Sequence, residues 1–118
     1  MAIPNPNLAP HAAATEEQYR DLSYACDNAL EACEGMADDT VDIAMDSLAR
    51  HLVIFTRAYR QAHGTNTPNE PACALLERRS RTLKSYGTSI SNEQQRKKEL
   101  YNAAREAQWI GDQMANAT

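Results

Sequence analysis

The residue types that could bind a metal or attack a substrate are scattered along this chain of 118 residues. A dinuclear metal site in a helical bundle uses Glu-x-x-His motifs on facing helices. None of the three histidines, at positions 11, 51 and 63, has a glutamate three residues before it. The remaining route to a metal site is convergence of Cys26, Cys33 and Cys73. We expect no cofactor, and a small metal-binding or catalytic helical protein stays as an alternative.

Thiol chemistry would require a cysteine with a lowered pKa. A nucleophilic cysteine needs a nearby histidine and a positive environment. Cys33 falls within the apolar stripe of a predicted helix, and Cys73 falls to one side of another stripe. These positions favour small packing residues over nucleophiles. The sequence also lacks a glycine-rich phosphate loop and a G-x-S-x-G motif, so we expect a protein that is not an enzyme.

Basic residues form two clusters, at 78–84 and 96–98. The members that could contact phosphates are Arg78, Arg81, Lys84, Lys97 and Lys98. Phosphate contacts need only positive charge within reach, but here no aromatic residues are interleaved with the charges to stack on bases. A solvated surface is the simpler interpretation. A nucleic-acid accessory protein that uses these residues is the first alternative function.

Acidic residues gather on one flank of the first predicted helix and at the start of the second. They are Asp27, Glu31, Glu34, Asp38, Asp39, Asp42 and Asp46. Residues 1–63 carry ten acidic and four basic side chains, whereas residues 64–118 carry six and eight. This balance differs from that of a dedicated DNA-binding domain. The flank is either an ordinary solvated surface or an acidic face complementary to a basic partner.

Three apolar side chains fall outside the predicted core stripes. Ile43 and Ile54 lie on a second face of the helix expected at 40–63, and Trp109 lies among polar residues. Aromatic residues on polar faces are enriched as anchors of interfaces. Trp109 could equally cover a neighbouring helix. These residues are candidates for contact with a protein partner or with another copy of the chain.

The leading hypothesis is therefore a non-enzymatic helical module for protein–protein interaction. In its narrower form, it is an inhibitor or adaptor that presents an acidic face to a basic, nucleic-acid-processing partner. Homo-oligomer formation is a further option.

The sequence is rich in alanine and poor in aromatic residues and glycine, which favours helix over strand. We expect four helices to position these residues. Thr15 with Gln18 and Ser91 with Gln94 resemble capping boxes, and Thr40 and Pro71 fit the first positions of two more helices. Gly35, Gly64 and Gly87 fit helix ends. Leu75 is expected to face inward, and Arg79, which falls inside an apolar stripe, needs solvent or an acidic partner.

The predicted fold is all-α, an antiparallel bundle of about four helices at 15–118, preceded by a flexible proline-rich arm at 1–14. No run of residues is apolar enough to span a membrane, and no secretory signal is recognisable. The odd number of cysteines favours reduced thiols. A soluble, cytoplasmic protein is expected.

Overall fold

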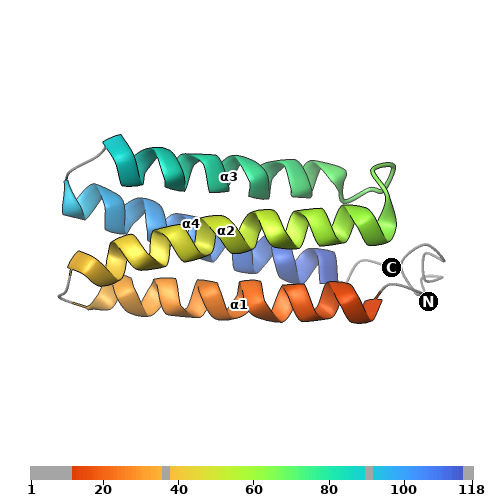
Figure 1. Cartoon of the computed structure of the whole chain (residues 1–118), viewed down its shortest axis with the longest axis horizontal. Helices are drawn as coiled ribbons and strands as arrows, with labels where there is room; N and C mark the ends of the chain where they lie inside the picture. The colour runs from red at the N-terminus through yellow and green to blue at the C-terminus, as the bar shows by residue number, and fades with distance from the viewer. Residues whose placement is uncertain (1–11, 36–37, 90–91, 116–118) are drawn as a thin grey trace.

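Four α-helices make up the computed structural model, which describes residues 12–35, 38–89 and 92–115, with side chains at 15–35, 40–86 and 92–114. The helices are α1 (Ala12–Glu34), α2 (Asp38–His63), α3 (Glu70–Ser89) and α4 (Glu93–Ala115). Successive helices run in opposite directions (Figure 1). The predicted all-α antiparallel bundle is confirmed.

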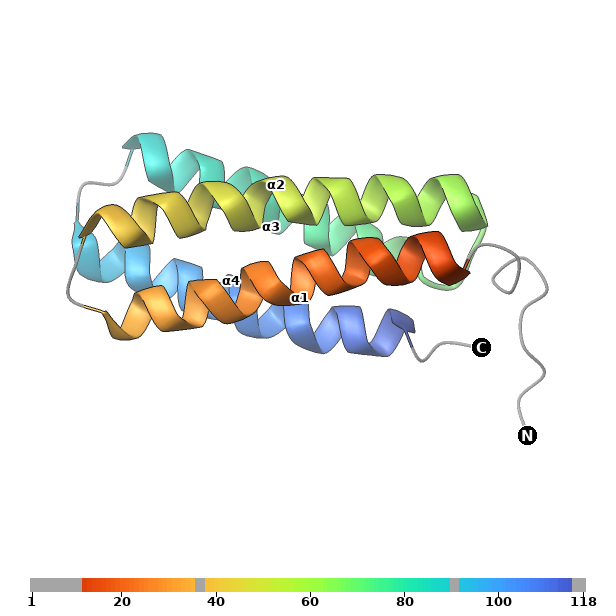
Figure 2. The same ribbon diagram turned by 60° about the horizontal axis from the view of Figure 1, so that its bottom comes forward.

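Each helix packs on its neighbours in the chain, and α4 closes the bundle by packing on α1 (Figures 1 and 2). Helices α2 and α4 also touch across the centre, whereas α1 and α3 lie on opposite corners. The outer faces of α2 and α4 therefore point away from each other. Among the described residues, no helix is long and apolar enough to cross a membrane.

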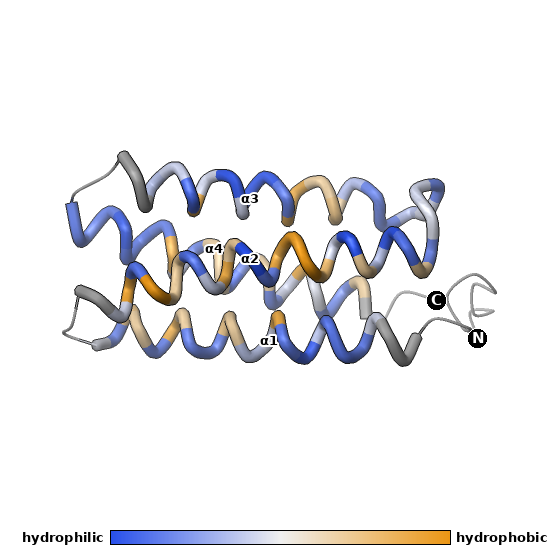
Figure 3. The backbone as a smooth tube through the Cα atoms, viewed as in Figure 1, coloured by the Kyte–Doolittle hydropathy of each residue, from blue (hydrophilic) through white to orange (hydrophobic). Residues whose placement is uncertain are grey.

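The core is organised around α2, whose Leu48, Leu52, Phe55 and Tyr59 are almost completely buried. The most hydrophobic run, residues 52–55, lies at the middle of this helix (Figure 3). Helices α1 and α4 face it with small side chains, which allow close approach of helix backbones. The buried alanines of these two helices are Ala25, Ala29, Ala32, Ala103, Ala104 and Ala107.

Several predicted helix ends are wrong by a few residues. Helix α1 begins at Ala12, so Thr15 is not an N-cap, and its Oγ1 instead lies 3.1 Å from Nε2 of His63. Helix α2 begins at Asp38, ahead of Thr40. Helix α3 begins at Glu70 and continues through Gly87 to Ser89. Only Gly64 has positive φ, at 78°, among the described residues, and it ends α2 as predicted.

The N-cap of α4 is Asn92, whose Oδ1 accepts hydrogen bonds from the amides of Gln94 and Gln95. The predicted cap, Ser91, lies outside the described residues. Residues 1–11 of the predicted arm also lie outside them, while residues 12–14 belong to α1.

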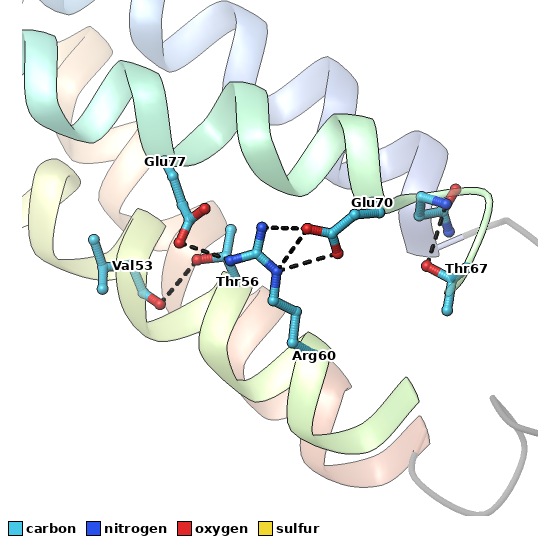
Figure 4. A network of polar contacts seen from close by, with 7 residues as sticks. Val53, Thr56, Arg60, Thr67, Glu70 and Glu77 are labelled. Atoms are coloured by element: carbon cyan, nitrogen blue, oxygen red, sulfur yellow. Dashed lines mark hydrogen bonds and ion pairs between the residues drawn. The ribbon is translucent and has the colours of Figure 1, made fainter. Parts of the chain in front are cut away.

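Two arginines link the helices through polar contacts. Arg60 on α2 binds Glu70 at 2.5 Å and Glu77 at 2.7 Å, both on α3 (Figure 4). Arg79 on α3 binds Glu106 at 2.7 Å and Glu99 at 3.0 Å, both on α4. Arg79 thus has the acidic partners that its position within an apolar stripe required. Leu75, one turn earlier, is 40% exposed, so its predicted inward orientation is wrong.

Candidate partner-binding surfaces

Helix α1 presents an acidic outer face. It carries six acidic residues against one basic residue, Arg20, and all six acidic side chains are exposed. Tyr24 stands in the middle of this face with 71% of its surface exposed. At about 100° per residue, Tyr24 lies roughly opposite the buried Leu22. We define the α1 face as Glu16, Glu17, Asp21, Tyr24, Asp27, Glu31 and Glu34.

Ion pairing distinguishes the carboxylates of α1 from those of the other helices. Every described carboxylate of α2, α3 and α4 lies in an ion pair or accepts a hydrogen bond, as Asp112 does from the Tyr19 hydroxyl. Within the described part of the chain, the α1 carboxylates form no ion pair. Asp27 accepts a hydrogen bond of 2.8 Å from Nε2 of Gln108. Among the described carboxylates, those of α1 therefore carry the negative charge that no ion pair within the bundle compensates.

Two of the paired carboxylates, Glu70 and Glu106, have lowered pKa values. Hydrogen bonds from Arg60 lower the pKa of Glu70, and hydrogen bonds from Arg79 lower the pKa of Glu106. The same pairs raise the pKa of both guanidinium groups. These charges stabilise contacts between helices inside the molecule, which leaves them less suited to a partner.

The predicted acidic face is divided by the structure. Asp27, Glu31 and Glu34 are exposed on α1 as required. Asp42 pairs with Arg96 of α4 at 3.4 Å, and Asp46 pairs with Arg50 at 3.7 Å. The side chains of Asp38 and Asp39 lie outside the described residues. The uncompensated acidic surface thus follows α1 and does not continue onto the described part of α2.

Sequence reasoning missed Tyr24, Glu17 and Asp21 as members of this surface. The helical periodicity contained the signal, because Glu17, Asp21, Tyr24 and Glu31 recur at intervals of three, four and seven residues. The missing information was which acidic groups the other helices would neutralise.

The predicted basic set does not form a single patch. Arg78 and Arg81 are exposed on α3, and Lys84 of the same helix is also exposed. Lys97 instead reaches the C-terminal end of α1, where its Nζ donates a hydrogen bond of 3.2 Å to the carbonyl of Gly35, the residue after the helix. Lys97 also pairs with Glu93 at 2.8 Å. Lys98 is exposed on α4. Because α1 and α3 occupy opposite corners of the bundle, Lys97 is directed away from the α3 cluster.

The predicted apolar residues are all exposed but lie on two sides of the bundle. Ile43 is 70% exposed and Ile54 is 38% exposed, both on the outer face of α2. Trp109 is 65% exposed on the outer face of α4. It therefore does not cover a neighbouring helix within the monomer.

None of the three cysteines has the lowered pKa of an activated thiol. Cys26 and Cys73 are completely buried, and burial raises the pKa of Cys26 to about 12 and of Cys73 to about 11. Burial also raises the pKa of Cys33, which is partly exposed and donates a hydrogen bond to the carbonyl of Lys97. The described residues contain no cluster of three or more His, Cys, Asp or Glu that could hold a metal ion.

Searches against protein-family models, curated proteins and solved structures gave no significant match to this chain.

Proposed function

We propose that this protein is a non-enzymatic interaction module whose α1 face binds a basic surface on a protein partner. The observation that carries the proposal is the contrast in ion pairing. The described carboxylates of α2 and α3, together with Glu93, Glu99 and Glu106 of α4, lie in ion pairs within the molecule, whereas those of α1 are exposed and form no ion pair. An uncompensated charged surface steers oppositely charged partners and orients them before contact.

Tyr24 offers the α1 face an aromatic anchor that could contribute binding energy. Electrostatic complementarity mainly sets association rate and orientation, whereas binding energy concentrates at a few anchors that are often aromatic. Tyr24 offers a large apolar ring with a polar hydroxyl, and it stands among the carboxylates of the α1 face. A partner with arginines or lysines around a pocket for this ring would fit the surface.

The length of the α1 face supports a narrower version. From Glu16 to Glu34 the row of carboxylates spans about 27 Å at 1.5 Å per residue. A basic groove that accommodates nucleic acid offers a positive surface of the same extended kind. In this version, the protein acts as an inhibitor or adaptor that places α1 in such a groove.

The first test uses nonaarginine peptide as a defined basic probe. Amide chemical shifts of the labelled protein are followed during titration at low salt and at 0.5 M NaCl. We expect the largest changes at residues 16–34, and a loss of the response at high salt because the attraction is screened. The triple variant Asp27→Asn/Glu31→Gln/Glu34→Gln should weaken the response, while Arg78→Gln/Arg81→Gln should not. A response centred on α2, α3 or α4 would contradict the proposal.

The second test identifies and measures a natural partner. Proteins that bind the immobilised wild type but not the immobilised triple variant are purified. Each purified protein is then titrated with the wild type and with the variants. Tyr24→Ala should weaken the affinity by about tenfold or more, as expected for an aromatic anchor. Trp109→Ala is the matched control, since it removes an equally exposed aromatic residue from another face. If every purified protein binds the wild type and the triple variant equally well, the α1 face is not the binding site.

A further inference from the structure

The outer face of α2 carries a regular row of exposed residues that the bundle does not use. Ile43, Asp46, Arg50, Ile54 and Arg57 are all exposed, and they follow one another at intervals of three or four residues. This spacing keeps them on one side of the helix, roughly opposite the buried Leu48, Leu52 and Phe55. Helix α2 thus has a second, exposed face on which two isoleucines alternate with charged residues.

The order of residues along this face is self-complementary about position 48. Asp46 lies two residues before position 48, and Arg50 lies two residues after it. Five residues away stand Ile43 and Val53, with Ile54 next to Val53. Nine residues away in the sequence are Asp39 and Arg57, although the side chain of Asp39 lies outside the described residues. Asp46 thus has a basic counterpart in Arg50, and Ile43 has an apolar counterpart in Val53, whereas the counterpart of Ile54 is Asp42.

We infer that α2 pairs with α2 of a second copy of this chain in an antiparallel, two-fold symmetric dimer. In this arrangement the two copies of Leu48 lie level with each other. Asp46 of each copy meets Arg50 of the other, and Ile43 of each meets Val53 and Ile54 of the other. A symmetric dimer brings the same patch of both subunits together, so the patch must be self-complementary.

Charge decides the direction of the pairing. A parallel arrangement in register would set Asp46 beside Asp46 and Arg50 beside Arg50, which costs free energy through like-charge repulsion. The antiparallel arrangement replaces these contacts with two intermolecular ion pairs. Asp46 and Arg50 are available for them, because their side chains are 76% and 62% exposed and their contact within the helix is long, at 3.7 Å. The partner that this face fits is therefore another copy of the same helix in the opposite direction.

The central test is a charge swap followed by sedimentation equilibrium of the full chain at concentrations up to about 1 mM. The wild type should show a concentration-dependent dimer, since a contact centred on one helix lies at the small end of specific interfaces. Asp46→Arg alone and Arg50→Asp alone should each raise the dimer dissociation constant by about tenfold or more, because each substitution acts twice in the dimer. The double variant Asp46→Arg/Arg50→Asp should restore dimerisation.

Two further variants define the face. Ile43→Asp should abolish the dimer without lowering the melting temperature, because Ile43 is exposed in the monomer. Trp109→Ser is the matched control and should leave the dimer intact. A wild type that stays monomeric over the whole concentration range would overturn the inference, as would a dimer that survives Ile43→Asp or dissociates with Trp109→Ser.

Cysteine cross-linking then tests the direction. Antiparallel pairing places the two copies of position 43 about 15 Å apart along the helix axes, at 1.5 Å per residue. Ile43→Cys alone should therefore not cross-link, whereas a mixture of Ile43→Cys and Val53→Cys should form the mixed disulfide under oxidising conditions. These variants are made in a Cys33→Ser chain because Cys33 is partly exposed, whereas native Cys26 and Cys73 are buried and contribute little background. Efficient cross-linking of Ile43→Cys with itself would contradict the antiparallel arrangement. Because these variants lie on α2, their outcome is independent of the α1 face proposed above.

Discussion

Gly111 should be a position where adding one methyl group destabilises the bundle. A Cβ placed at Gly111 would lie 2.8 Å from Cε1 of Tyr19, closer than side chains tolerate. The tyrosine ring cannot swing away freely, because its hydroxyl donates a hydrogen bond to Asp112 and its ring packs at 6.0 Å from that of Phe55. Gly111 therefore permits the close contact between α1 and α4.

The size of the effect follows from two opposing contributions. Replacing a helical glycine by alanine stabilises the helix by about 0.5–1 kcal/mol, and overpacking by one carbon costs about 1–3 kcal/mol. We expect Gly111→Ala to lower the free energy of unfolding by about 1 kcal/mol, or the melting temperature by about 4 °C for a domain of this size. Urea denaturation followed by circular dichroism measures the loss.

A double-mutant cycle separates the two contributions. Tyr19→Leu removes Cε1 and keeps an apolar side chain, so in that background Gly111→Ala should have only its helix-stabilising effect. In the Tyr19→Leu background, Gly111→Ala should then raise the free energy of unfolding instead of lowering it. If Gly111→Ala stabilises the wild type, or destabilises both backgrounds equally, the steric argument is wrong.

Two other predictions concern the interior of the bundle. Arg79→Met should destabilise the protein by about 1–3 kcal/mol at pH 7, because it leaves the half-buried Glu99 and Glu106 without their cation. Since Arg79 lowers the pKa of Glu106, this stabilisation is complete above the ordinary carboxyl pKa and is lost as the pH falls through the lowered one. Urea denaturation at several pH values should thus show the difference between Arg79→Met and the wild type shrinking towards pH 2, and a constant difference would contradict the assignment. In the native protein at pH 8, iodoacetamide should modify Cys33 before Cys26 and Cys73, which are completely buried and have pKa values raised to about 12 and 11. Mass spectrometry of the labelled peptides measures the order, and simultaneous labelling of all three would argue against this burial.

The sequence alone determined that four helices form and approximately where they lie. Apolar residues at intervals of three and four specify an amphipathic helix, and its hydrogen bonds are all local. Helix ends were less certain, since several residues can serve as caps. Thr15 has the chemistry of an N-cap and yet lies inside α1, where it contacts His63, 48 residues later.

Only the tertiary structure decided which surface groups remain unsatisfied. The sequence indicated that Arg79 needs an acidic partner, but Glu99 and Glu106, on a different helix, become its partners through the register of α3 against α4. Packing of α2 near α4 likewise pairs Asp42 with Arg96. The α1 carboxylates gain no such cation from the described residues. Ion pairs between helices depend on the relative height and rotation of two helices, which the periodicity of one helix does not specify. The acidic residues could thus be recognised from the sequence, whereas the location of the uncompensated charge on α1 required the fold.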